Sequence, residues 1–140
     1  MKIYSDSVPL QSSKQREAIN INSRVKAAVE KSALREGVVI VSSLHSDCAV
    51  ILLQDDPAIL DLLDRTLDRL ASSEKSEEDT GLTGSIGENP AAHVQGALLG
   101  QRVVITFSEA RLDLGPREAI FFVELGGIRP RRLIVKILGE

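Results

Sequence analysis

The run Val38-Val39-Ile40-Val41, followed after a short polar stretch by Cys48-Ala49-Val50-Ile51-Leu52-Leu53, decides the fold of this chain. The first run is short, continuously apolar and rich in β-branched residues, which predicts a buried strand, and the second run predicts the next strand. His45 lies just past the end of the first strand, where side chains can converge on a site. Because residues 38–41 are apolar on both faces, and a monomer of this size rarely covers both faces of every strand, we infer a homo-oligomer.

Three helices are expected from cap residues and apolar spacing. The first has Asn22 as its N-cap and is ended by Gly37. The second begins at Asp56-Pro57, with Asp at the N-cap and Pro at the first helical position, and the third begins at Pro90. The apolar faces of the three helices are, in turn, Val25, Ala28, Val29 and Ala33; Ile59, Leu63, Thr66, Leu67 and Leu70; and Ala92, Leu98 and Leu99.

The remaining segments predict strands that are neighbours in sequence. One or two strands are expected in the first twenty residues, and four more follow the third helix, over residues 102–107, 111–114, 119–125 and 131–138. Residues 72–87 are polar, charged and interrupted by glycines, which predicts a mobile loop. Because runs of neighbouring strands favour antiparallel pairing, we expect one α+β domain over residues 1–140, with largely antiparallel, sandwich-like sheets and about three helices.

Composition argues against several classes of function. A net charge of −3, with three Phe, one Tyr and no Trp, argues against binding to a phosphate backbone and against base stacking, so we expect no nucleic-acid partner. Cys48 is the single cysteine, which excludes an internal disulfide and a zinc site built from several thiolates. No apolar run approaches the roughly 20 residues that span a bilayer. The first residues have no apolar signal core, so we expect a cytoplasmic protein without a membrane partner.

Charge is distributed unevenly along the chain. Residues 55–79 are rich in Asp and Glu, whereas the final third carries Arg102, Arg111, Arg117, Arg129, Arg131, Arg132 and Lys136. One interpretation is two solvated faces of opposite charge that complement each other. The other is that a few of these arginines bind a phosphorylated small molecule.

The two histidines, His45 and His93, each lie in a short polar motif at the edge of an apolar segment. Histidine can exchange protons or bind a metal near neutral pH, so the two motifs indicate either a shared site or two unrelated histidines. Asp47, close to His45, can orient the imidazole or bind a metal, or it can be a turn aspartate that bonds its own backbone. We interpret Cys48 as a small buried hydrophobe rather than a nucleophile or ligand.

Seven short motifs follow one another along the chain. They are Ile19-Asn20-Ile21-Asn22, Glu36-Gly37, His45-Ser46-Asp47-Cys48-Ala49, Asp56-Pro57, Asn89 through His93 to Leu98-Leu99-Gly100, Arg111-Leu112-Asp113-Leu114-Gly115, and Arg131-Arg132 with the final Gly139-Glu140. In this order they resemble the YjbQ-like family, called secondary thiamine phosphate synthases, over nearly the whole length. The resemblance implies an α+β subunit with two facing sheets, assembled as a homotrimer, with a site near the subunit boundary that uses both histidine motifs.

The activity that the resemblance implies is the joining of a pyrimidine pyrophosphate to a thiazole phosphate, in which the thiazole nitrogen attacks and pyrophosphate leaves. That chemistry needs cations on the departing phosphates. The chain also departs from the family pattern. It lacks the further histidine that members usually have between the two kept here, it has Pro116-Arg117-Glu118 where members commonly have Thr-Trp-Gln, and it has Asp47 in place of a threonine. These departures indicate altered or lost chemistry.

Two functions therefore compete. The first is a YjbQ-like enzyme of the thiamine phosphate synthase type with weakened or altered activity, and the alternative is a catalytically inactive trimeric binding or scaffolding relative. A third possibility is a divalent metal held by His45, His93 and a carboxylate, although no close His-x-x-x-His spacing supports it. The expected partner is a small phosphorylated molecule or anion. The candidate catalytic residues are His45 and His93, and the candidate substrate-binding residues are Ser46, Asp47, Asn89, Arg111 and Glu118.

Overall fold

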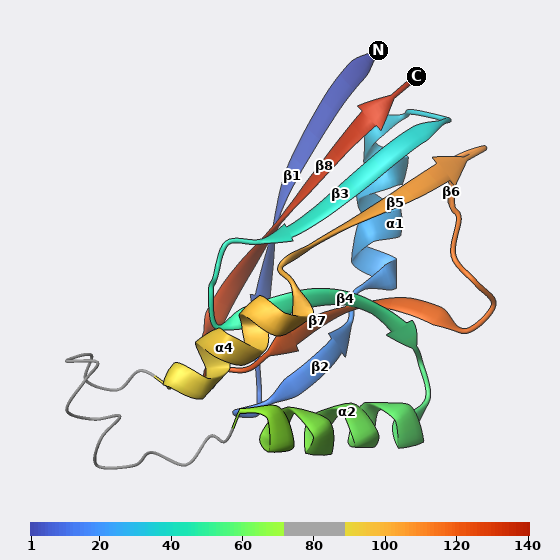
Figure 1. Ribbon diagram of the computed structural model, residues 1–140. Helices are drawn as coiled ribbons and strands as arrows, with labels where there is room; N and C mark the ends of the chain where they lie inside the picture. Colours follow the sequence, from blue (N-terminus) through green and yellow to red (C-terminus); the bar gives the residue numbers. More distant parts are fainter. Residues whose placement is uncertain (72–88) are drawn as a thin grey trace.

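The computed structural model describes residues 1–71 and 89–140 as eight strands and three helices (Figure 1). Their order is the predicted one of strands, a helix, two strands, two helices and four strands. The bounds are β1 Lys2–Gln11, β2 Glu17–Asn20, α1 Asn22–Ser32, β3 Gly37–Ser43, β4 Cys48–Gln54, α2 Pro57–Leu70, α4 Pro90–Leu99, β5 Arg102–Ser108, β6 Arg111–Leu112, β7 Glu118–Glu124 and β8 Pro130–Gly139. The predicted mobile loop at residues 72–87 lies outside the described residues.

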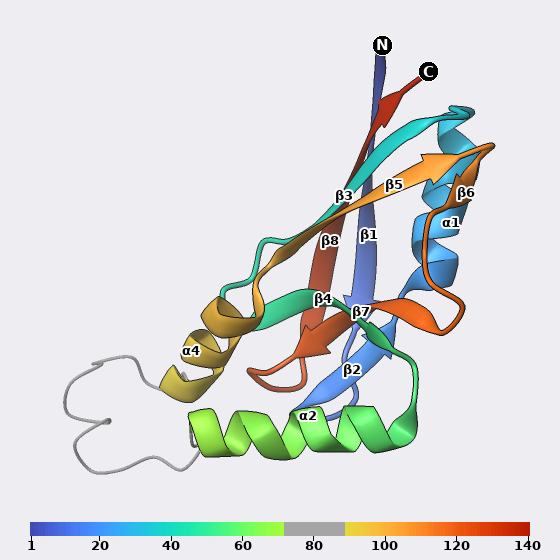
Figure 2. The same ribbon diagram turned by 45° about the vertical axis from the view of Figure 1, so that its right-hand side comes forward.

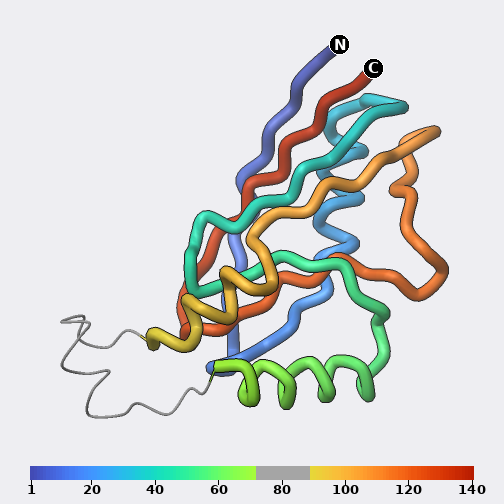
Figure 3. Tube along the Cα trace, in the orientation of Figure 1, coloured from blue at the N-terminus to red at the C-terminus, as the bar shows by residue number. Residues whose placement is uncertain are grey.

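The strands form two antiparallel sheets, as the α+β interpretation expects. The larger has the order β1-β8-β3-β5-β6 and the smaller has the order β2-β7-β4. Among the described strands, β5 and β6 are the only consecutive pair that is hydrogen-bonded, so β3 and β4 lie in different sheets although the chain passes directly from one to the other. The first and last strands pair from Lys2 with Gly139 onward, and Figure 3 shows the two chain ends side by side.

Two cores explain why the strands of the three-stranded sheet are apolar on both faces. The main core lies between the sheets and is completed by α1, which contributes Val25, Ala28 and Val29. The second core lies on the other face of the three-stranded sheet, where Leu67 of α2 and Ala92 of α4 pack against it. Figure 2 shows α2 along the side of this sheet that faces away from the five-stranded sheet. As a result, six of the seven residues of β7 are buried.

The structure corrects both predicted ends of α1. The N-cap is Ile21 rather than Asn22, because the Asn22 side chain accepts a hydrogen bond from the backbone N–H of Ile120 at 2.8 Å and so ties the helix to β7. The helix ends at Ser32, not at Gly37, and Ala33 takes the left-handed C-cap conformation with φ of 59°. Ala33 is therefore exposed rather than part of the apolar face.

The apolar faces of the other two helices also differ in part from the predicted ones. In α2, capped by Asp56 as expected, Leu60 packs against the sheet and Leu70 is exposed. In α4, Leu98 is exposed, whereas Gln95 is buried and donates hydrogen bonds to the carbonyl oxygens at the C-terminal end of α2. Of the helices that the structure describes, none combines the length and the apolar character needed to cross a membrane.

Candidate functional site

The loop between β3 and β4 positions the first histidine motif, and it is held by hydrogen bonds of its own. The backbone N–H of His45 donates to Ser43 Oγ at 3.1 Å, and the backbone carbonyl of His45 accepts from the N–H of Cys48 at 3.2 Å. The Gln101 side chain, just before β5, donates to the same carbonyl at 3.3 Å. These bonds fix a tight turn, so that His45, Ser46 and Asp47 contact three different parts of the molecule.

The His45 imidazole is half-buried against β8. Its Nε2 accepts a hydrogen bond from the backbone N–H of Arg132 at 3.1 Å. Burial, followed by the positive charge of Arg131, lowers the pKa of His45 from its usual value, and the nearby Asp47 and Glu124 carboxylates only partly oppose this shift. The neutral imidazole is therefore favoured at neutral pH.

Ser46 brings the second histidine motif to this loop. Its Oγ lies 2.9 Å from Nδ1 of His93, which is on the first turn of α4. The helix can approach so closely because residue 96 is glycine: a Cβ there would lie 2.7 Å from the backbone oxygen of Ser46. Asn89 caps the same helix, since its side chain accepts from the backbone N–H of Ala92. The motifs around the two histidines thus meet at one place, as the shared-site hypothesis requires.

Asp47 turns inward and enters a buried charged network. Its two carboxylate oxygens accept from Nη1 and Nη2 of Arg131, each at 3.0 Å, in a bidentate pair. Burial alone would raise the pKa of Asp47, but the hydrogen bonds and charge of Arg131 outweigh it and hold the pKa below its usual value. A Cβ on Gly126 would collide with this carboxylate, so the turn after β7 needs glycine there. Asp47 is therefore a buried partner of Arg131 and not a solvent-exposed turn aspartate that bonds only its own backbone.

Glu124 completes the network from β7 and is 0% exposed. It accepts from Nε and Nη2 of Arg131 at 2.7 and 2.6 Å, from the Ser12 hydroxyl at 2.8 Å and from the backbone N–H of Gly126 at 3.1 Å. Burial opposes ionisation, yet these donors hold the pKa of Glu124 below its usual value. Two carboxylates and one guanidinium, all with partners, thus lie directly beneath the His45 loop.

Two of the predicted site residues lie elsewhere in the same subunit. Arg111 is on β6, is exposed and pairs with Glu109; β6 adjoins the end of β5 opposite α4 (Figure 1). Since β5 has seven residues, a strand rise of about 3.3 Å per residue puts Arg111 roughly 20 Å from the His45 loop. Glu118 begins β7 at the end remote from Glu124 and accepts from the backbone N–H of Gly115 at 3.2 Å.

The described residues offer no ready metal site. No group of three or more His, Cys, Asp or Glu side chains within residues 1–71 and 89–140 is arranged to hold an ion. Both oxygens of Asp47, the carboxylate nearest to His45 in sequence, are bonded to Arg131. Cys48 is buried beside Glu124, and burial followed by that carboxylate raises the pKa of its thiol, so it packs as a small hydrophobe as expected.

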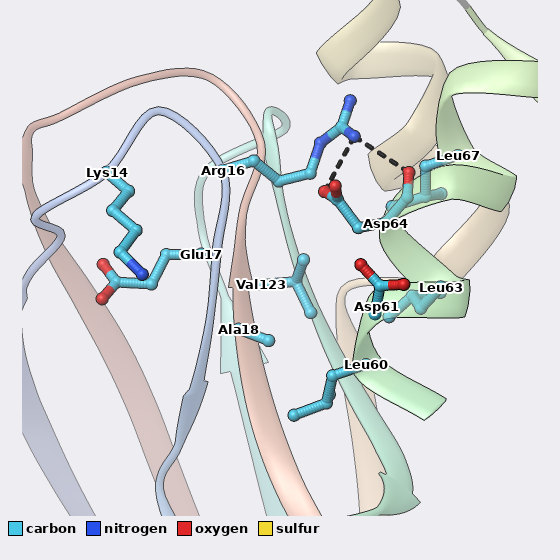
Figure 4. Close-up of a pocket in the computed structure, with 10 residues that line it drawn as sticks. All are labelled: Lys14, Arg16, Glu17, Ala18, Leu60, Asp61, Leu63, Asp64, Leu67 and Val123. Carbon is cyan, nitrogen blue, oxygen red and sulfur yellow. Dashed lines mark hydrogen bonds and ion pairs between the residues drawn. The ribbon is translucent and has the colours of Figure 1, made fainter. Parts of the chain in front are cut away.

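A concavity that sequence analysis did not indicate lies between the loop after β1 and helix α2. It has a volume of about 340 Å³ and an apolar floor that includes Ala18, Leu60 and Val123 (Figure 4). Its rim is charged, but Arg16 is already paired with Asp64 at 2.9 Å and with Asp68 at 2.8 Å. These ion pairs fasten the loop to α2, which gives the polar rim a structural role.

Sequence analysis missed the residues that support the loop. Arg131 was expected in a C-terminal motif and among the arginines interpreted as solvated charge or as phosphate ligands, and nothing local to Glu124 or Ser12 indicated a buried network. Arg132 and Arg129 belonged to the same group of arginines and were not linked to the histidines, although the backbone N–H of Arg132 donates to His45 and Arg129 Nη1 lies 3.9 Å from Asp47. The one available indication was the pair of adjacent arginines in a strand whose alternate residues are buried.

Comparisons with known proteins agree with this architecture. A family model described as UPF0047 protein YjbQ-like matches residues 6–140. A UPF0047 protein of Methanothermobacter thermautotrophicus is 30% identical over 140 residues, which cover all of this chain and 95% of that protein. The UPF0047 protein YugU of Bacillus subtilis is 25% identical and covers 93% of this chain and 96% of its own length.

Solved structures give the same result. A YbjQ-like protein of unknown function from Sulfolobus solfataricus superposes with a TM-score of 0.90 at 27% identity, covering 99% of each chain. A protein of the yjbq/upf0047 family from Clostridium acetobutylicum superposes with a TM-score of 0.85 at 26% identity, covering 95% of this chain and 99% of that one. The fold, the order of the motifs and these matches lead to one conclusion: this chain belongs to the YjbQ-like UPF0047 family.

Proposed function

We propose that this protein binds a small phosphorylated molecule or anion at the surface formed by His45, Ser46 and His93, and that it does so as a homotrimer. The observation that carries the proposal is the 2.9 Å contact between Ser46 Oγ and His93 Nδ1, because it joins two polar motifs that are far apart in sequence. Binding of a phosphate would need cations, and two exposed arginines adjoin the His45 loop. Arg129 Nη1 lies 3.9 Å from Asp47, and Arg132 donates to His45 through its backbone N–H while its guanidinium donates to Ser7.

The reaction class that the family resemblance indicates is a transfer in which a pyrimidine pyrophosphate is joined to a thiazole phosphate. In this chain the imidazoles would bind the departing oxyanion, and Arg129 or Arg132 would supply positive charge in place of Arg111, which lies at the far end of β5 within the subunit. Arg111 would take part only from another subunit of the trimer.

The outer surface of the five-stranded sheet supports the oligomeric part of the proposal. Ile3 of β1 is 63% exposed and Val104 of β5 is 61% exposed, and the strands between them present Leu138, Val38 and Ile40 on the same face. Around the histidines, the exposed apolar side chains are Leu44, Val94 and Leu98. Apolar groups in both places are typical of surfaces that another subunit covers.

Titration calorimetry with inorganic pyrophosphate tests the binding proposal. We expect Ser46→Ala and His93→Ala to weaken binding by about tenfold or more, since each removes a hydrogen-bonding group at a charged ligand. Arg24→Ala is the control, because Arg24 is an exposed residue on α1. Unchanged affinity in both site variants would contradict the proposal.

Light scattering tests the trimer. We expect a mass of three subunits of 15.2 kDa each, and we expect Val104→Glu to dissociate the assembly because it places a charge in an apolar interface. Leu62→Glu is the matched control, since Leu62 is a half-exposed leucine on α2. A well-folded wild-type monomer at micromolar concentration would overturn this part.

A catalytically inactive binding or scaffolding relative is the second candidate. It is favoured by Asp47, which replaces a threonine of the family pattern and is bonded to Arg131 instead of facing a ligand. The two candidates differ in turnover. Formation of thiamine phosphate from the two phosphorylated precursors supports the enzyme, whereas tight pyrophosphate binding without any product supports the binding relative.

A further inference from the structure

We infer that His45 is locked as the neutral tautomer that carries its proton on Nδ1, so that this histidine offers a bound oxyanion a hydrogen-bond donor. The tautomer rests on geometry alone, and the identity of the acceptor rests on the proposed anion-binding function. This assignment separates the two histidines, because the Ser46 hydroxyl beside Nδ1 of His93 can either donate or accept and fixes no tautomer.

The partner of His45 leaves no ambiguity about the direction of its hydrogen bond. A backbone N–H can only donate, and the N–H of Arg132 lies 3.1 Å from Nε2 of His45. Nε2 is therefore an acceptor and carries no proton. A neutral imidazole has one donor and one acceptor nitrogen, so the proton is on Nδ1.

The buried network holds the two partners of this bond in place. Arg131 immediately precedes Arg132, and its guanidinium is bonded to Asp47, two residues after His45. Glu124 holds the same guanidinium from β7. The bidentate pair thus fixes the register between the His45 loop and β8, which is what places the Arg132 N–H against the imidazole. Asp47 and Arg131 are in this respect positioning residues.

The charges around His45 agree with a neutral ring. The cations that face it are Arg131 and Arg129, and the anions are Asp47 and Glu124, which are already paired with Arg131. Burial and the arginines hold the pKa of His45 below its usual value. A neutral Nδ1–H then donates to an oxygen of a phosphate or pyrophosphate across the neutral pH range. Metal binding at Nε2 would instead require the Arg132 N–H to lose its partner.

Nitrogen NMR of protein labelled with ¹⁵N-histidine tests the tautomer without any ligand. The chain has two histidines, so the spectrum of His93→Ala assigns the signals of His45. We expect a protonated, pyrrole-type Nδ1 and a pyridine-type Nε2 at neutral pH. A protonated Nε2, or protons on both nitrogens, would overturn the inference.

A pair of variants tests the donor role with inorganic pyrophosphate as the probe. Gln in place of His45 can put its amide oxygen where Nε2 is and still accept from the Arg132 N–H, but it has no donor at the Nδ1 position. We therefore expect His45→Gln to keep the thermal stability of the wild type and to lose affinity as much as His45→Ala does, by about ten- to a hundredfold. Affinity restored by Gln would show that the ring only supports Arg132, and would overturn the donor role.

Addition of pyrophosphate to the ¹⁵N-histidine-labelled protein, followed by NMR, separates this inference from the proposed function. On binding, the Nδ1 proton of His45 should shift as it forms a bond to the oxyanion. If pyrophosphate binds and that proton does not move, the donor role is wrong and anion binding stands. If pyrophosphate does not bind to the wild type, the proposed function and the donor role both fail, while the ¹⁵N spectrum still decides the tautomer.

Discussion

A glutamate lies at each end of the β4–β7 strand pair, and the two glutamates have opposite environments. At one end Cys48 pairs with Glu124, and at the other Gln54 pairs with Glu118. Glu124 is fully buried and accepts from Ser12, Gly126 and Arg131. Glu118 is partly exposed and accepts from the backbone of Gly115. Only the first end therefore needs a dedicated counter-charge.

This difference shows which end of the strand pair depends on particular partner side chains. A buried carboxylate is tolerated only when every oxygen has a partner, and within the described residues no buried side-chain nitrogen or oxygen lacks one. Meeting that condition at the Glu124 end requires Arg131, Asp47 and a glycine at 126 together. The candidate site is built on this end, so its loop is held by charge pairing as well as by backbone bonds.

Removal of the Arg131 guanidinium should have the largest effect on the stability of the folded protein. Arg131→Ala leaves Asp47 and Glu124 buried without their counter-charge, and we expect the free energy of unfolding to fall by about 3–5 kcal/mol. Denaturant unfolding measures the change. Arg117→Ala, an exposed arginine at the Glu118 end, is the control and should stay within about 0.5 kcal/mol of the wild type.

A comparable loss for Arg117→Ala, or a small loss for Arg131→Ala, would show that the two ends do not differ as argued. A further variant separates charge from packing. Arg131→Ala combined with Glu124→Gln and Asp47→Asn removes the unpaired charges, so we expect it to be more stable than Arg131→Ala alone.

The second comparison uses one glycine from each end. Gly126→Ala places a Cβ against the Asp47 carboxylate, and we expect a loss of about 1–3 kcal/mol in the free energy of unfolding. Gly115→Ala is the control, since its Cβ would lie 3.6 Å from the Glu118 Cβ, an ordinary contact. Equal losses in the two variants, measured by denaturant unfolding, would argue against a rigid fit around Asp47.

Low pH should destabilise the folded protein through the buried carboxylates at the Glu124 end of the strand pair. The pKa values of Asp47 and Glu124 are lowered in the folded protein, whereas unfolded carboxyls titrate near about 4. Below that range the unfolded chain binds more protons, so the stability that these pairs provide is present above about pH 4 and is lost as pH falls further. Denaturation curves at several pH values measure the slope, and Asp47→Asn should make it shallower. Equal slopes would contradict the assignment.

Local pattern was enough to predict the elements of this fold, but not their pairing. The apolar run at residues 38–41 and the Asp56-Pro57 cap depend on neighbours in sequence, and both were interpreted correctly. The placement of β3 and β4 in different sheets depends on partners far along the chain, β8 and β7, and no local pattern encodes it. The end of α1 was wrong because Ala33 takes a left-handed conformation that favours glycine.

The residues of the candidate site also divide into those that local sequence predicted and those that depend on distant partners. Sequence analysis placed His45 at a strand end and His93 on a short helix, and the structure has both there, with Ser46 joining the two motifs. Their joint use by one ligand stays a prediction. The network beneath them depends on a pair between Asp47 and Arg131 that are 84 residues apart. Neither residue type nor spacing indicates such a pair, because most Asp and Arg side chains are solvated.

The smallest change in the free energy of unfolding is expected at the Glu118 end of the strand pair. Glu118→Gln keeps an oxygen that can accept from the backbone N–H of Gly115, and solvent screens the lost charge, so the free energy of unfolding should change by less than about 0.5 kcal/mol. Glu124→Gln is the matched variant at the buried end. It puts an amide N–H₂ among the donors Ser12, Gly126 and Arg131, and we expect it to cost about 1–3 kcal/mol or more. Parallel unfolding curves for these two variants decide whether burial, rather than the position in the strand pair, sets the importance of a glutamate here.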